Sequence, residues 1–179
     1  MFSPDKSVLI VVDVQGKLAT LMHEKEDLFS NIKGLIQAAH LLAIPVLMTE
    51  QVPEKIGSTI EEIRSLVSPD KIFSKETFSC YGEKDFVTTL RGLYRKQIIV
   101  CGIETHVCIY QTVFDLIQNS FKVQLVVDAI SSRDKLHKDV ALQRMEKLGA
   151  DLTTTEMLLT ELIRTSAHPK FKEILHFIR

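Results

Sequence analysis

Short apolar runs alternate with segments of helical periodicity along the whole chain. Six runs are expected to form strands: Ser7–Val12, Pro45–Met48, Lys71–Ser74, Gln97–Cys101, Lys122–Val127 and Asp151–Thr154. Most of them are continuously apolar rather than alternating, which is typical of parallel strands covered on both faces. The pattern therefore predicts a parallel sheet buried between two layers of helices.

Helical segments separate these runs. We expect helices at Ile32–Ala43, Thr59–Val67, Glu83–Tyr94, His106–Asn119, Leu136–Leu148 and Glu156–Arg164, with a last short helix near Pro169. Strand–helix alternation predicts a doubly wound α/β fold with right-handed crossovers. Residues 1–179 should form one three-layer, Rossmann-like domain. Its parallel six-stranded sheet should have the strand order 3-2-1-4-5-6, with helices on both faces.

That strand order reverses the direction of the chain between strands 1 and 4. Open α/β sheets bind ligands in the crevice beyond the carboxyl ends of the strands, at such a switch point. The segments that follow strands 1, 3 and 4 are Asp13, Lys75–Tyr81 and Gly102–Cys108. Functional side chains are therefore expected among these residues.

Composition and charge narrow the class of protein. The 179 residues are 45% hydrophobic and 25% charged, with a net charge of −1. Such a balance produces no field that would attract nucleic acid or a membrane surface. The apolar runs are too short to span a bilayer, and Met1–Lys6 does not resemble the start of a signal peptide. A cytoplasmic globular protein is expected.

The three cysteines have different surroundings in the sequence. An odd, small number argues against a disulfide framework, and no zinc-like spacing occurs. Cys101 lies in an apolar strand and should be a buried hydrophobe, whereas Cys80 lies in a loop near the predicted crevice. Cys108 falls in the first turn of a helix starting near Thr105, where the helix dipole favours a thiolate. We therefore expect Cys108 to be the most reactive cysteine, with a depressed thiol pKa.

Asp13 and Lys75 are individually unremarkable. Asp13, after five apolar residues, could simply cap the next turn, and Lys75 could be a solvated loop residue. Their joint placement with Cys108 around one switch point is more informative. A cation beside a carboxylate and a thiol stabilises both anions and a later tetrahedral oxyanion.

Three motifs carry a family resemblance. VVDVQ at Val11–Gln15, SKETFS at Ser74–Ser79 and CGIETHVC at Cys101–Cys108 resemble the signatures of isochorismatase-like cysteine hydrolases in order and spacing. VVDAISSR at Val126–Arg133 extends the similarity, which covers nearly the whole chain. The resemblance implies the fold predicted above, a hydrolase activity and a homo-oligomer, from dimers upward.

The resemblance also implies a catalytic triad. In this family an aspartate acts as general base, a lysine assists, and a cysteine attacks a carbonyl or imine carbon before water releases the product. These roles transfer to Asp13, Lys75 and Cys108. Lys75 is preferred to Lys71 because it stands three residues before Phe78, as in the family pattern K-x-x-F-S.

Further site residues follow from the same resemblance. The family carries a non-proline cis peptide before the helix that bears the cysteine, which maps here between Ile103 and Glu104. It implies an oxyanion hole from backbone amides near Glu104 and Cys108. Gln15 and Phe78 join Ile103 and Glu104 as the expected substrate and oxyanion residues. A small-molecule substrate and no cofactor are expected.

One branch of the family differs from this chain. Nicotinamidases bind a metal through Asp-x-His after strand 2, where this chain has Thr49-Glu50-Gln51. No metal site is therefore expected, and nicotinamide is disfavoured as a substrate. Glu104 replaces a small residue of those enzymes, so its carboxylate should narrow or polarise the pocket. The chain most resembles the metal-free isochorismatase domain-containing subgroup.

Two functional hypotheses remain. The first is a hydrolase of a small amide, imide or related carbonyl compound, which the intact triad favours. The alternative is a non-catalytic isochorismatase-fold protein that serves binding or assembly. A nucleotide-binding domain is disfavoured because the segment Asp13–Lys17 has a single glycine and no phosphate-binding loop. The cysteine favours amide-type substrates over the vinyl ether of isochorismate.

Overall fold

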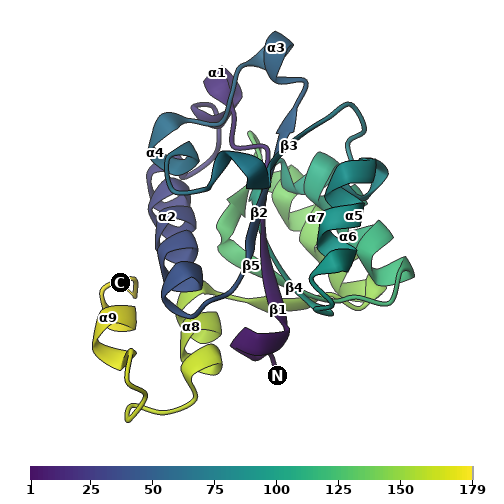
Figure 1. Ribbon diagram of the computed structural model, residues 1–179. Coiled ribbons are helices and arrows are strands. Elements are labelled where there is room, and N and C mark those ends of the chain that lie inside the picture. Colours follow the sequence, from purple (N-terminus) through teal and green to yellow (C-terminus); the bar gives the residue numbers. More distant parts are fainter. Residues whose placement is uncertain (179) are drawn as a thin grey trace.

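The computed structural model describes residues 1–178 and contains one parallel sheet in the order β3-β2-β1-β4-β5-β6 (Figure 1). Its strands are β1 (Ser7–Val12), β2 (Val46–Gln51), β3 (Ile72–Lys75), β4 (Gln97–Ile103), β5 (Lys122–Ser131) and β6 (Asp151–Thr153). The predicted fold class and strand order are confirmed. The order places the carboxyl ends of β1 and β4 side by side, where the chain changes direction.

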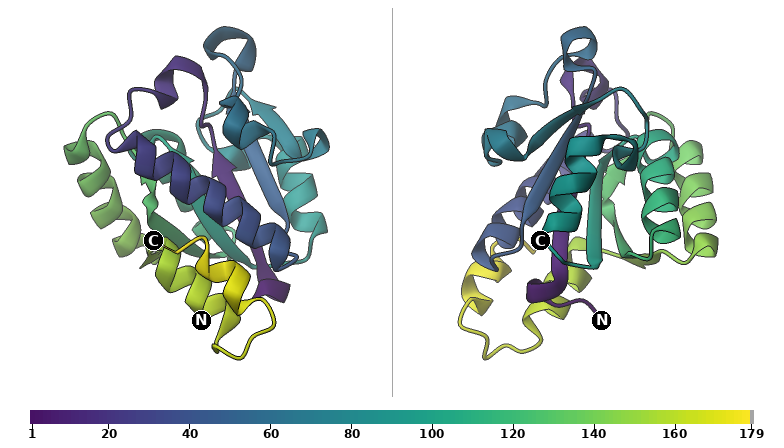
Figure 2. Two further views of the ribbon diagram at one scale, coloured as in Figure 1. Left: turned by 90° about the vertical axis from the view of Figure 1, so that its left-hand side faces the viewer. Right: turned by 45° about the vertical axis from the view of Figure 1, so that its right-hand side comes forward.

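Helices cover both faces of the sheet. They are α1 (Gly16–Ala19), α2 (Lys25–Leu41), α3 (Pro53–Ile56), α4 (Glu61–Arg64), α5 (Lys84–Gly92), α6 (Tyr110–Gln118), α7 (Lys135–Leu148), α8 (Thr155–Ile163) and α9 (Phe171–Leu175). Helices α2, α4, α8 and α9 lie on one side, and α5, α6 and α7 lie on the other (Figures 1 and 2). The molecule is thus a three-layer α/β structure.

The central strand β1 contributes side chains to both hydrophobic cores. Successive side chains of a strand point to opposite faces of its sheet. Leu9 and Val11 accordingly pack with α2 and α8, whereas Val8, Ile10 and Val12 pack with α5 and α6. This burial on both faces explains why the run is continuously apolar until it ends, just before Asp13.

Several strands are longer than predicted. β2 continues from the expected end at Met48 to Gln51, β4 continues to Ile103, and β5 continues to Ser131. The extensions of β2 and β5 contain polar residues, which the apolar pattern assigned to loops. They stay in strands because buried partners satisfy their hydrogen bonds, as the site below illustrates.

Two helix predictions are corrected. α2 begins at Lys25 rather than Ile32, because its first turns are mostly polar and carry little apolar periodicity. The helix expected at Thr59–Val67 shrinks to α4 (Glu61–Arg64). Thr59 instead forms an antiparallel bridge with Gln15, and this bridge ties the segment to the loop after β1.

The C-terminal apolar stretch docks on the body of the same chain. Ile174 of α9 is fully buried in the core shared with α2 and α8. Gly34 of α2 faces Phe177, and a Cβ at position 34 would lie 3.4 Å from the Cβ of Phe177, at ordinary van der Waals contact. None of the helices formed by residues 1–178 combines the length and the apolar character needed to cross a bilayer.

Candidate active site

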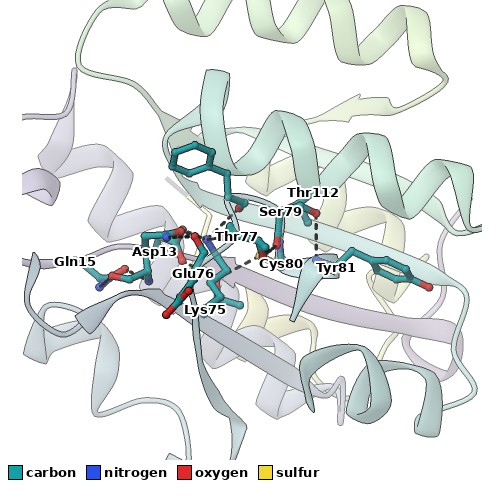
Figure 3. Close-up of polar contacts among 12 residues, drawn as sticks. Asp13, Gln15, Lys75, Glu76, Thr77, Ser79, Cys80, Tyr81 and Thr112 are labelled. Atoms are coloured by element: carbon teal, nitrogen blue, oxygen red, sulfur yellow. Dashed lines mark hydrogen bonds and ion pairs between the residues drawn. The ribbon is translucent and has the colours of Figure 1, made fainter. Parts of the chain in front are cut away.

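A buried ion pair lies at the switch point. Asp13, directly after β1, and Lys75, the last residue of β3, are each only 2% exposed, and Lys75 Nζ lies 2.6 Å from Asp13 Oδ2 (Figure 3). Desolvation is the largest single effect and disfavours the charged ammonium, but the charge and hydrogen bond of Asp13, together with the smaller effects of Cys80 and Cys108, outweigh it and raise the pKa of Lys75. The pair therefore holds opposite charges inside the protein.

Lys75 is anchored by further acceptors. Its Nζ also donates to Gln51 Oε1 at 2.7 Å and to the carbonyl oxygens of Phe78 at 3.0 Å and Thr77 at 3.2 Å. The loop after β3 thus wraps its own carbonyls around the ammonium group. This arrangement gives the lysine one orientation, toward Asp13.

Two cysteines lie beside the pair. The charges of Asp13 and Lys75 both act on Cys108, in a five-residue π-helical turn (Thr105–Ile109), and on Cys80, at the start of a 3-10 turn (Cys80–Gly82). Cys80 is fully buried, its N–H donates to Thr112 Oγ1 at 2.9 Å, and its Sγ lies 3.4 Å from Thr49 Oγ1. Cys108 keeps 8% exposure. Cys101 is buried in β4, as the sequence predicted.

The expected depression of the Cys108 pKa is wrong. Burial first, and the carboxylate of Asp13 second, raise the pKa of the Cys108 thiol, and Lys75 offsets only part of this rise. The helix-dipole argument overlooked that Cys108 itself is packed into the core, where an ionised sulfur loses its hydration. Cys108 therefore rests as a neutral thiol and needs a base.

Cys80 provides a prediction about alkaline stability. Burial raises the pKa of Cys80 from 9.0 to about 11. Between pH 9 and 11 the unfolded chain releases this proton while the folded chain retains it. The folded state then binds more protons, so the free energy of unfolding falls as the pH rises, by up to about 3 kcal/mol from this thiol.

Urea unfolding of wild type and Cys80→Ala at several pH values checks this effect. The fall between pH 9 and 11 should be shallower in the variant, because alanine has no proton to release. Parallel pH profiles for the two proteins would show that Cys80 titrates equally in the folded and unfolded chains.

The end of β4 brings the remaining backbone of the site into place. Gly102 has φ +119°, and a Cβ there would come within 2.1 Å of the carbonyl oxygen of Val12, so only glycine fits beside β1. The peptide bond between Ile103 and Glu104 is cis, as the resemblance implies. Glu104 Oε1 accepts hydrogen bonds from Arg133 N at 3.2 Å and Arg133 Nε at 3.0 Å.

Two predicted substrate residues have other contacts in this structure. Gln15 is fully buried. Its side-chain Nε2 donates to the carbonyl oxygens of Gln51 and Gly57, and its Oε1 accepts a hydrogen bond from Gln51 N. It thereby braces the loop that carries Asp13. Phe78 has a half-exposed side chain, and its carbonyl binds Lys75. Ile103 is fully buried at the end of β4, in the core that includes α2 and α8.

The sequence reasoning missed Thr49 and Gln51 as parts of the site, and it placed Cys80 near the crevice without giving it a role. All three lie directly around the Asp13–Lys75 pair (Figure 3 labels Cys80). Polar residues at alternate positions just past an apolar run were the available signal for Thr49 and Gln51. Within residues 1–178 no group of three or more histidine, cysteine or acidic side chains is arranged to hold a metal ion.

The comparison with protein families decides the affiliation of the chain. The model of the isochorismatase domain matches residues 7–157, from β1 into α8. The chain belongs to the isochorismatase family. Membership of this family is consistent with a hydrolase, and the matched region contains every predicted site residue.

Relatives in the isochorismatase family are similar over nearly the whole chain. Isochorismatase domain-containing protein 1 of Danio rerio is 36% identical over 177 residues, which are 99% of this chain and 62% of that protein. The chain thus spans less than two thirds of the zebrafish relative. The structure described as MAR1 ribonuclease from Caenorhabditis elegans is 36% identical, with a TM-score of 0.92, and covers 99% of this chain and 91% of that one.

A more distant isochorismatase fold is known as an assembly. The YcaC gene product from Escherichia coli, described as an octameric hydrolase of unknown specificity, has a TM-score of 0.88 at 21% identity. The match covers 98% of this chain and 94% of that one. At this identity the likeness concerns the fold.

Proposed function

We propose that this protein is a cysteine hydrolase of a small amide, imide or related carbonyl compound. Cys108 is the nucleophile, Asp13 is the general base, and Lys75 holds Asp13 in place. The observation that carries the proposal is the buried Lys75–Asp13 pair, 2.6 Å apart, beside a neutral thiol at the switch point. A buried charge pair next to a nucleophile is costly to maintain and is typical of functional sites.

The first half of the reaction forms a covalent intermediate. Asp13 takes the proton of the Cys108 thiol while the sulfur attacks the carbonyl carbon, so the negative charge moves to the carbonyl oxygen. The tetrahedral intermediate then collapses, and the carbon–nitrogen bond breaks. The leaving nitrogen takes the proton from Asp13, which leaves an acyl group on Cys108 as a thioester.

The second half returns the enzyme to its starting state. Asp13 removes a proton from a water molecule, and the hydroxide attacks the thioester carbon. The carbon–sulfur bond breaks, the acid product leaves, and the Cys108 thiolate regains the proton from Asp13. One carboxylate serves both halves, because a base in one step acts as the acid in the next. Lys75 stays positively charged through both halves of the reaction, and its attraction holds the Asp13 carboxylate in place.

Backbone amides are proposed to stabilise the negative charge that develops on the substrate carbonyl oxygen. The Glu104 N–H has no acceptor within the described chain, and it precedes the turn that bears Cys108. We infer that this N–H and that of Cys108 stabilise the oxygen on which charge develops, an effect typically worth about 3–4 kcal/mol per donor. The Glu104 carboxylate, held by Arg133, contributes polarity to the same end of β4.

Cys108 is preferred to Cys80 as the nucleophile for a physical reason. Cys80 has no exposed surface, and its thiol is engaged with Thr49. A nucleophile must reach a substrate carbon, and Cys108 alone of the two retains an exposed surface. Cys80 is therefore assigned to the support of the site.

The domain organisation, the cofactor requirement, the location and the assembly of the protein are proposed on the same basis. Residues 1–179 are proposed to act as one domain, without a cofactor, on a small molecule in the cytoplasm. Assembly into a homo-oligomer, a dimer or larger, is also proposed, and the octameric E. coli protein of the same fold supports it.

Trapping the covalent intermediate tests the proposal. The protein is incubated with a panel of small amides, imides and esters, quenched in acid, and analysed by intact and peptide mass spectrometry. We expect an acyl group on the Cys108 peptide in wild type and in Cys80→Ala, and none in Cys108→Ala.

Other outcomes identify other functions. An acyl group on Cys80 would overturn the assignment of the nucleophile. A short single-stranded RNA belongs in the panel because the C. elegans relative is named a ribonuclease. Its cleavage by both wild type and Cys108→Ala would overturn the covalent mechanism. No turnover and no adduct with any compound would favour the non-catalytic binding or assembly function.

A further inference from the structure

The last residues of β2 (Val46–Gln51) face two different environments. Alternate side chains of a strand share a face, so Thr49 and Gln51 point one way and Glu50 points the other. Glu50 Oε1 accepts from Thr59 N at 2.7 Å and from Arg64 Nε at 3.4 Å, on the side of α4. Thr49 contacts Asp13, and Gln51 contacts Lys75.

Thr49 is fully buried, and two hydrogen bonds join it to Asp13. Its Oγ1 donates to Asp13 Oδ1 at 2.8 Å, and its carbonyl accepts from Asp13 N at 3.1 Å. β2 and β1 are paired in register there, with Val12 opposite Thr49. The strand pairing therefore fixes the hydroxyl directly beside the carboxylate.

The direction of this hydrogen bond follows from proton counting. An ionised carboxylate only accepts, so the single hydroxyl proton of Thr49 goes to Asp13. The contact of 3.4 Å between Thr49 Oγ1 and Cys80 Sγ must then be donated by the thiol. This requires Cys80 to be protonated, which agrees with the raised pKa of Cys80. A chain of donors runs from Cys80 through Thr49 to Asp13.

The two carboxylate oxygens thus have different partners. Oδ2 pairs with the Lys75 ammonium, while Oδ1 receives the Thr49 hydroxyl. The titratable groups acting on this region are Lys75 from the end of β3, Cys80 from the 3-10 turn and Cys108 from the π-helical turn. Among the side chains at the carboxylate, Thr49 supplies a donor that carries no charge and does not titrate.

We propose that Thr49 is a positioning residue that keeps Asp13 ionised and aimed at Cys108, and thereby sets the pH range in which the Cys108 proton is transferred. This inference rests on the proposed function, since it concerns the same base and nucleophile. A hydrogen bond to a charged group favours the charged form.

Alkylation of Cys108 against pH tests this role without needing a substrate. Iodoacetamide is reacted with the folded protein between pH 4 and 9, and mass spectrometry of the Cys108 peptide gives the rate. In Thr49→Val the acidic limb of the profile should move to higher pH by about one unit. Thr49→Ser restores the hydroxyl and should return the limb to its wild-type position.

A matched control separates this effect from packing. Thr59 is also buried, and its hydroxyl has no partner within the described chain. Thr59→Val therefore makes the same chemical change without removing a hydrogen bond to Asp13, and it should leave the limb unmoved. Thr49→Ala provides a smaller side chain if valine prevents folding, and it should shift the limb in the same direction as valine.

The outcomes separate this inference from the proposed function. An unchanged acidic limb in both Thr49→Val and Thr49→Ala, or an equal shift in Thr59→Val, would overturn the role of Thr49. So would a wild-type Cys108 that stays unmodified across the whole pH range. Failure of the proposed function would instead appear as full turnover in Cys108→Ala, which is measured in a separate experiment.

Discussion

Alanine replacement of Cys108, Asp13 or Lys75 is expected to lower kcat by about 10⁴-fold or more in each case. The triple variant should be little worse than any single one. The physical reason is that the three side chains act in one step. Cys108 is a neutral thiol until Asp13 removes its proton, and Asp13 is held for that transfer by Lys75 at 2.6 Å. Without any one of them, the sulfur cannot attack.

Steady-state kinetics of the three single variants and the triple variant measure this non-additivity, with a substrate found in the screen. Cys101→Ala is the matched cysteine control and should retain most of the activity, and Cys80→Ala is measured beside it. A loss in Cys80→Ala with activity preserved in Cys108→Ala would exchange the roles of the two thiols. Losses that multiply from one variant to the next would indicate that the residues act independently.

Replacement of Lys75 with methionine should also destabilise the fold strongly. Lys75 and Asp13 are both buried, so methionine leaves the Asp13 carboxylate without its cation and the carbonyls of Thr77 and Phe78 without their donor. Breaking a buried ion pair on one side typically costs about 3–5 kcal/mol. Urea unfolding at pH 7 should show a decrease of that size in the free energy of unfolding.

The double variant Asp13→Asn/Lys75→Met separates stability from activity. Asparagine suits this position because Asp13 has φ 50°, in the left-handed region that asparagine tolerates. Removing both charges should restore most of the lost stability and none of the turnover.

Lys71→Met is the control for the loss of a lysine, since Lys71 pairs with Asp70 on the surface at 2.7 Å. Its effect should stay below about 1 kcal/mol. If Lys75→Met unfolds no more easily than Lys71→Met, the buried pair does not hold the site together.

The positions of the site residues along the chain were predictable for a simple reason. In a parallel α/β sheet all strand carboxyl ends meet at one edge, so a polar residue just after an apolar run is expected there. Asp13 after β1 and Lys75 at the end of β3 follow this rule. The end of β2 does not follow this rule, because Thr49 and Gln51 are polar residues that remain in a strand beside the site.

The ionisation of the site was not predictable in the same way. The sequence placed Cys108 at a helix start and so favoured a thiolate, but burial and Asp13 favour the thiol. Desolvation depends on how many neighbours cover a group, and neighbours from distant segments are not visible in a local pattern. The same limit hid the contacts of Cys80 with Thr49 and Thr112, which lie 31 and 32 positions away in the sequence.

The sequence by itself determined the strand order, the family resemblance and the three side chains of the proposed triad, because apolar periodicity and motif spacing are local properties of the chain. Only the tertiary structure decided which groups surround those side chains. It placed Thr49 and Gln51 on the face of β2 that meets Asp13 and Lys75, and it buried Cys108 deeply enough to keep its proton. The physical reason is that hydrogen bonding and desolvation act across space, between residues that only folding brings together.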